Sequence, residues 1–155
     1  MCHRKCPVHK YGPLLAIAIL AGCGFKEYRD VSALPENAPL VNQEYLLREE
    51  LLLHAVARNN NKVTDYYTIT TKPGFAGRYV VFRRVLPVGT LLRIKQVQEC
   101  TTWLCSDKQL LVELPGLPYS DHPITVRDTF DGIDMLTYEN GRATINPHLL
   151  ESAKR

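Results

Sequence analysis

The clearest structural signal in this sequence is the stretch Met-Leu-Thr-Tyr-Glu-Asn-Gly-Arg-Ala-Thr-Ile, residues 135–145. Asn140-Gly141 is the favoured residue pair for a two-residue type I′ turn, which joins two antiparallel strands. Such a turn sets Glu139 opposite Arg142, a favourable pair of opposite charges across the two strands. We therefore predict a β-hairpin with strands at Met135 to Tyr138 and Arg142 to Ile145.

The residues just after the hairpin predict a short C-terminal helix. Asn146 is a good N-cap residue, and Pro147 would occupy the first helical position, where its missing N–H has little effect. We expect Leu149 and Leu150 to close one end of the hydrophobic core.

The chain before the hairpin also has the composition of strands separated by turns, such as Pro87-Val88-Gly89. The predicted strands are 65–71, 78–86, 90–99, 109–114 and 124–127. In the third of these, Leu92 and Ile94 share a face but Val97 does not, so we predict a β-bulge between Ile94 and Val97. About seven short strands predict a mainly β, single-domain protein built as a small barrel.

Residues 45–57 allow two interpretations. Their Leu, Glu, Arg and Ala content favours a helix. The alternative is a strand ending near Leu47, a turn at residues 48–50 and a second strand from Leu51 to Val56. Short apolar runs cannot be assigned from their period alone, so both interpretations stay open here.

The N-terminus has the parts of a secretory signal. Arg4, Lys5 and Lys10 precede an uninterrupted apolar run, Leu14 to Ala21. This run is much shorter than the roughly 20 residues that a membrane-spanning helix needs.

Leu20-Ala21-Gly22-Cys23 resembles the lipobox of bacterial lipoproteins. The resemblance implies cleavage after Gly22, a diacylglycerol on the Cys23 thiol and an acylated amine at the same residue. Gly24 in second position implies the periplasmic face of the outer membrane rather than the inner membrane. A second, short likeness lies in residues 86–94, which are similar to part of the Src-homology-type barrels.

These observations divide the chain into three parts. Residues 1–22 are the predicted signal peptide, residues 23–40 are the lipidated cysteine with a tether, and residues 41–155 are the compact β-rich domain. The three basic residues of the signal account for the whole formal charge of +3. The mature chain is therefore neutral, and it lacks the basic stripe expected of a nucleic-acid-binding domain.

Cys100 and Cys105 are the two cysteines left after Cys23 in a chain that we expect to be exported. Export favours a disulfide, and four intervening residues argue against a thioredoxin-type redox pair. Trp103 lies inside this ring, either as an exposed binding residue or folded back over the barrel.

Catalytic and metal-binding motifs are not evident. His54, His122 and His148 are far apart in sequence, and the spacing of Asp128, Asp131 and Asp134 does not fit an EF-type calcium loop. The sequence therefore predicts no catalytic residues, metal or cofactor.

Three functions are compatible with the sequence. The first is a non-enzymatic envelope lipoprotein whose domain binds a protein or cell-wall partner while its lipid is held in the bilayer. The second is an inhibitor or immunity lipoprotein against an envelope-acting enzyme or toxin. The third is an envelope hydrolase with an unrecognised site.

Overall fold

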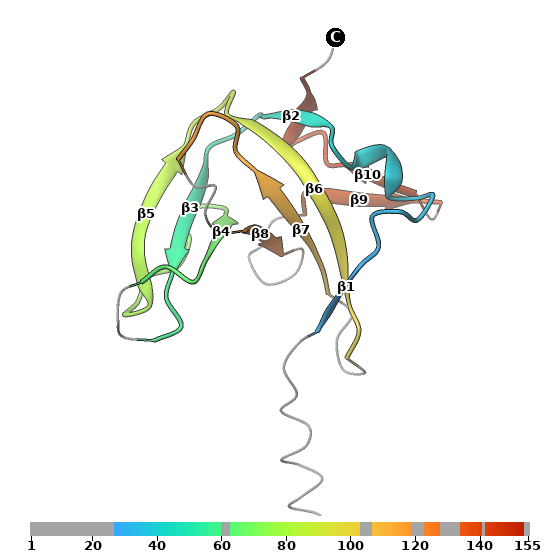
Figure 1. The fold of residues 1–155 in the computed structure, drawn as a ribbon. Helices are drawn as coiled ribbons and strands as arrows, with labels where there is room; N and C mark the ends of the chain where they lie inside the picture. The colour runs from blue at the N-terminus through green and yellow to red at the C-terminus, as the bar shows by residue number, and fades with distance from the viewer. Residues whose placement is uncertain are drawn as a thin grey trace, which may run out of the picture.

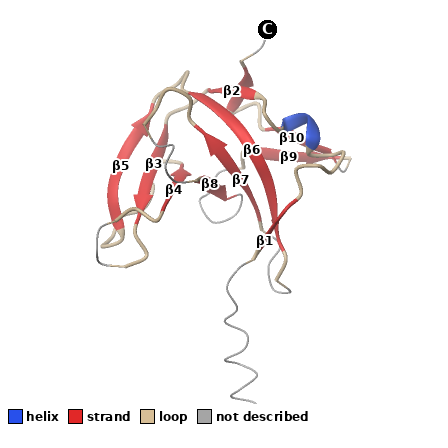
Figure 2. Ribbon diagram, in the orientation of Figure 1, coloured by secondary structure: helices blue, strands red, loops and turns tan. Residues whose placement is uncertain are grey.

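The computed structural model of the chain describes residues 27–59, 63–102, 107–118, 123–127, 134–140 and 142–153. These residues form a single, mainly β domain (Figures 1 and 2), whose one helical element is the 3₁₀ turn η1, Ala38–Leu40. The strands are β1 Tyr28–Asp30, β2 Glu44–Leu47, β3 Leu51–Val56, β4 Tyr66–Thr70, β5 Val80–Leu86, β6 Leu91–Cys100, β7 Lys108–Glu113, β8 Ile124–Arg127, β9 Leu136–Glu139, β10 Arg142–Ile145 and β11 Leu150–Ser152.

Nine of these strands form one curved sheet, in the order β11-β2-β6-β7-β8-β4-β3-β5, with β1 added alongside β6. All pairs in it are antiparallel except β4 with β8. The sheet is open, because its two ends, β5 and β11, do not pair with each other in the described part of the chain. The predicted small barrel is therefore wrong, because the described sheet does not close. Alternation of side chains indicates which residues face inward, but not which strands pair to complete a ring.

β6 is the longest strand, and it connects three neighbours. It pairs with β1, β2 and β7, and its register with β7 shifts between Ile94 and Gln96. This shift is the predicted β-bulge, and it returns Val97 to the core with an exposed fraction of 0%. The extra residue lets β6 bend around the core while Leu92, Ile94 and Val97 all stay buried.

The ambiguous residues 45–57 form strands β2 and β3, so the prediction of two strands with a turn between them is confirmed. β3 lies between β4 and β5 and all six of its residues are buried. A strand that is covered on both faces is apolar on both faces, which explains why its period could not exclude a helix. Glu49 is exposed in the turn between the two strands, where it disturbs no apolar face.

The predicted hairpin is confirmed. β9 and β10 pair with Glu139 opposite Arg142, and Asn140 has the positive φ of 51° that a type I′ turn requires of its first central residue. Gly141 lies outside the described residues. Leu136 and Ala143 belong to the core, and β10 contacts η1. The hairpin thus covers part of the core that the main sheet leaves uncovered.

The predicted C-terminal helix is wrong. Residues 147–149 form one turn, and the chain then continues as β11 along β2. Asn146 does cap this turn, since its Oδ1 accepts the His148 backbone N–H at 3.0 Å. Leu149 and Leu150 are buried as predicted. Pairing of Leu150 with Leu47 ends the turn before a helix can develop.

Residues 27–40, which were predicted as part of a tether, belong to the domain instead. Tyr28–Asp30 pairs with β6, and Val31 and Leu40 are buried in the core. The buried Asn37 side chain donates a hydrogen bond to the Val31 carbonyl at 2.9 Å. Only a few side chains of this segment face the core, so its charged and proline residues dominate the sequence and no apolar period is visible. The segment therefore resembled a tether. Within the described ranges, no helix is long and apolar enough to cross a membrane.

Candidate functional site

β3 is buried on both faces of the sheet. Leu51, Leu53 and Ala55 point into the main core, while Leu52 and His54 are buried on the opposite face of the sheet. The loop between β4 and β5, residues 71–79, covers this opposite face. The face is therefore closed by a loop rather than by a second layer of sheet.

His54 holds this loop in place. Its Nε2 lies 3.0 Å from Thr70 Oγ1, and its ring stacks on Phe75 with 4.2 Å between ring centroids. Gly74 lies so close that a Cβ there would be 2.7 Å from His54 Nε2 and 2.9 Å from Leu52 Cδ1. Gly74 also has a φ of +71°, which favours glycine. The ring and the glycine together bring the loop backbone onto the sheet.

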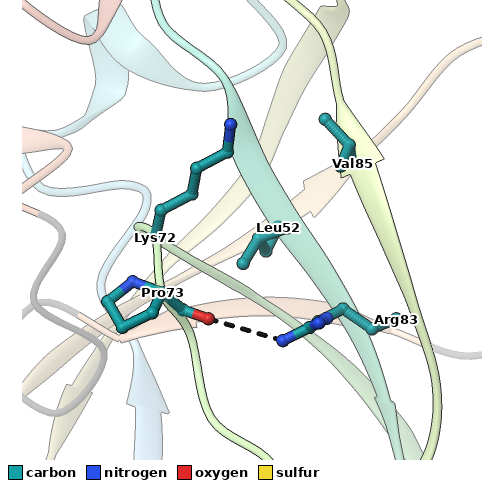
Figure 3. Close-up of a pocket in the computed structure, with 5 residues that line it drawn as sticks. All are labelled: Leu52, Lys72, Pro73, Arg83 and Val85. Carbon is teal, nitrogen blue, oxygen red and sulfur yellow. Dashed lines mark hydrogen bonds between the residues drawn. The ribbon is translucent and has the colours of Figure 1, made fainter.

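A groove lies beside this contact, between the loop and β5. It has a volume of about 690 Å³ and is lined by Leu52, Lys72, Pro73, Arg83 and Val85. Figure 3 shows Leu52 between Lys72 and Pro73 of the loop and Arg83 and Val85 of β5. Leu52 is buried at the base of the groove, whereas its other lining residues are exposed. The groove therefore combines an apolar base with two cationic side chains.

The two cations differ in their partners. Lys72 forms an ion pair with Glu50. Arg83 donates a hydrogen bond to the Pro73 carbonyl at 3.5 Å (Figure 3), and no carboxylate of the described residues pairs with it. A guanidinium has five N–H donors in a planar fork that suits carboxylates. Arg83 is thus the group in this groove best able to bind an anion.

Exposed apolar side chains are concentrated in the part of the chain that contains the loop and β5. Of the large apolar residues that are exposed in the described parts of the chain, most lie between residues 75 and 88: Phe75, Tyr79, Val81, Val85 and Val88. Val85 is 45% exposed at the rim of the groove. An exposed apolar side chain at the rim of a cationic groove, in a segment rich in others, is typical of a binding surface.

The site residues that the sequence predicts fall elsewhere. Cys23, Trp103 and Cys105 lie outside the described residues, so lipidation and the disulfide stay predictions. Cys100 ends β6, and its Sγ lies 3.2 Å from Thr102 Oγ1. Trp103 stays a predicted binding residue.

The residues considered for a hydrolytic or metal site are not brought together in the described part of the molecule. His54 is fully buried, whereas His148 is exposed in the turn before β11. His122, Asp128 and Asp131 lie outside the described residues. Among the residues that are described, no group of three His, Cys, Asp or Glu side chains could hold a metal ion.

Asp30, Tyr45 and Arg93 have shifted pKa values, and these residues lie on β1, β2 and β6, away from the groove. Hydrogen bonds from the Ser32 hydroxyl and backbone N–H lower the pKa of Asp30. Burial raises the pKa of Tyr45. The hydrogen bond to Glu44 raises the pKa of Arg93, which also pairs with Glu113.

Sequence reasoning missed the groove because its lining comes from three separate segments. Leu52 belongs to β3, Lys72 and Pro73 to the loop, and Arg83 and Val85 to β5. The basic pair Arg83-Arg84 was its one visible signal, and a pair is too short to be a basic stripe.

Comparison with known proteins identifies no relative. No family model, no curated protein and no solved structure matches this chain.

Proposed function

We propose that this protein is a membrane-anchored envelope lipoprotein whose β-domain is a non-enzymatic binding module. The lipobox at Leu20-Ala21-Gly22-Cys23 supports the anchor. The observation that carries the binding role is the groove on the outer face of β3 and β5. It joins an apolar base at Leu52 to the guanidinium of Arg83, beside exposed apolar side chains.

β1 lies close in sequence to the proposed anchor. β1 begins at Tyr28, and the described residues begin at Glu27. Only Gly24, Phe25 and Lys26 separate Cys23 from Glu27, and a fully extended chain of this length spans at most about 14 Å. The lipidated protein would therefore hold its domain at the membrane surface, within reach of other envelope components.

The anchor is tested by Cys23→Ser, with Cys6→Ser as the matched control. Cys6 precedes the proposed cleavage site, so its loss should leave labelling with palmitate and membrane fractionation unchanged. Cys23→Ser should abolish the label and release the protein from membranes. Retention of both label and membrane association in Cys23→Ser would refute the anchor.

The outer membrane is the proposed location, and Gly24→Asp tests it in an enteric host. An Asp in second position retains lipoproteins of such bacteria in the inner membrane. The variant should therefore shift to the inner-membrane fraction of a density gradient. An unchanged distribution would mean that Gly24 does not decide the destination.

The binding role is tested with a photocrosslinking amino acid at Val85, with Tyr138 as control position. Both side chains are exposed, at 45% and 41%, but Tyr138 lies on β9, away from the groove. In intact cells, crosslinks to a defined envelope component should form at Val85 and not at Tyr138. Equal crosslinking at both positions would show that the groove selects nothing.

A disulfide between Cys100 and Cys105 completes the proposal, because an exported domain enters an oxidising compartment. Alkylation of the unfolded, unreduced protein should then label neither cysteine. Labelling of both without reductant would refute the disulfide.

A further inference from the structure

β5 is an open edge of the main sheet. It pairs only with β3 in the described residues, and it forms the outermost strand in Figure 1. Its seven residues span about 23 Å. An edge of this length presents a row of backbone N–H and C=O groups that another strand can join.

The register shows which backbone groups face outward. The Val56 carbonyl accepts the N–H of Asp65, so the backbone groups of Val56 point toward β4. Because this direction alternates along a strand, the backbone groups of Leu52 and His54 also point toward β4. Leu51, Leu53 and Ala55 then bond to β5, through their partners Leu86, Arg84 and Phe82. The backbone groups of Arg83 and Val85 consequently point to the open edge.

The side chains of these same two residues line the groove. Val85 is paired with Leu52 and Arg83 with His54, so all four lie on the outer face of the sheet. A strand added to β5 would thus place its own side chains directly beside Arg83 and Val85, at the rim of the groove.

β5 and the chain on either side of it carry charge of one sign. From Tyr66 to Gln98 the sequence contains no Asp or Glu, and its basic residues are Lys72, Arg78, Arg83, Arg84, Arg93 and Lys95. Lys72, Arg93 and Lys95 pair with carboxylates outside this stretch. β5 itself contains no acid, and its Arg83 lies at the groove. A complementary strand would be acidic.

We propose that the β5 edge binds an extended, acidic segment of a partner protein as an added antiparallel strand. This inference rests on the proposed binding function and names the chemistry of the partner. An acidic residue of the segment lies opposite Arg83, and an apolar residue two positions before it lies opposite Val85. Backbone hydrogen bonds provide affinity, and these two side chains provide selectivity.

A second copy of this chain is disfavoured in the register with the fullest overlap of β5 on itself, which is centred on Arg83. Antiparallel pairing of β5 with β5 about Arg83 places two Arg83 side chains directly opposite each other. Like charges directly opposite in a strand pair are destabilising.

The test uses the detergent-solubilised full-length protein and a fluorescein-labelled peptide, Thr-Thr-Val-Thr-Glu-Thr-Thr, in a fluorescence anisotropy titration at low ionic strength. Saturable binding is expected. Two control peptides separate the contributions: one has Lys in place of Glu, and the other carries N-methyl groups on Val and Glu, which remove two backbone donors. Each change should weaken binding by about tenfold or more. Equal binding of the N-methylated peptide would overturn strand addition.

Protein variants then place the peptide on β5. Arg83→Glu should weaken binding of the Glu peptide by about tenfold and favour the Lys peptide, while Arg142→Glu, on β10, should change neither. Arg83 is exposed, so circular dichroism should show the variant folded. Unchanged selectivity in Arg83→Glu, or dimerisation of the protein through β5 in analytical ultracentrifugation, would overturn the inference. Crosslinking at Val85 without peptide binding would leave the binding module intact and reject only this partner chemistry.

Discussion

The two ends of the main sheet are built in opposite ways. β11 is three residues long, and its Leu150 is 1% exposed against Leu47 of β2. Arg48 donates a hydrogen bond to the Pro147 carbonyl at 2.8 Å, and the Ala153 N–H donates one to the Glu44 backbone carbonyl. The chain is therefore hydrogen-bonded to the sheet on both sides of β11. β5 is seven residues long, and Val85 on its outer face is 45% exposed.

This difference separates a structural edge from one available for binding. Short strands and tight packing are ways in which proteins protect an edge from unwanted pairing. β11 uses both. β5 is long and has a solvent-exposed apolar side chain. The positive charge of Arg83 protects this edge, because it disfavours pairing with a second copy about Arg83 and attracts an acidic strand.

The largest expected difference in the free energy of unfolding is between two truncations, Leu150→Ala on β11 and Val85→Ala on β5. Leu150→Ala should lower the free energy of unfolding by about 2–5 kcal/mol, because it leaves a cavity in the core. Val85→Ala should change it by no more than about 0.5 kcal/mol, because the side chain is half in solvent. Urea denaturation measures both. Equal losses would show that β5 is as structural as β11.

The next test examines the loop beside β5. Gly74→Ala should destabilise the protein, because the new Cβ would meet His54 and Leu52 and φ is positive. Gly116→Ala is the matched control: its φ is +82°, but nothing lies within 4 Å of its Cβ. The control should cost about 1–2 kcal/mol in backbone strain alone, and Gly74→Ala should cost more. Equal values in thermal denaturation would mean that the loop does not pack closely on β3.

A smaller effect is expected from two arginines of the same sheet. Arg93→Ala removes ion pairs with Glu44 and Glu113 that join β2, β6 and β7, so it should lower the urea midpoint at low salt and less so at high salt. Arg83→Ala removes one hydrogen bond to a carbonyl and should leave the midpoint nearly unchanged. A larger shift for Arg83→Ala would mean that this residue serves stability rather than binding.

The smallest effect concerns β1, which lies beside β6 and away from both ends. Hydrogen bonds from Ser32 lower the pKa of Asp30 below its ordinary value of 3.8. Their stabilisation is therefore present above pH 3.8 and is lost as pH falls through the lower pKa of the folded protein. Asp30→Asn should cause a slight loss of stability at neutral pH that disappears in strong acid. A loss independent of pH would assign the effect to packing instead.

Much of the local structure could be predicted from the sequence. Asn140-Gly141 located the β9–β10 hairpin, and the misplaced Val97 located the β-bulge of β6. In contrast, β1 was hidden within an irregular, charged segment, and the C-terminal helix was predicted from capping residues that in fact form one turn. The groove was missed because Leu52, Pro73 and Arg83 meet only through the pairing of β3 with β5 and the folding of the β4–β5 loop over β3.

By itself the sequence determined where many of the strands and turns lie, because turn residues and the two-residue period of side chains act over short distances. The tertiary structure alone decided that the sheet stays open, that β3 is buried on both faces, and that Arg83 and Val85 meet at an exposed edge. These properties depend on which strands become neighbours, and alternation within a strand carries no information about its neighbours.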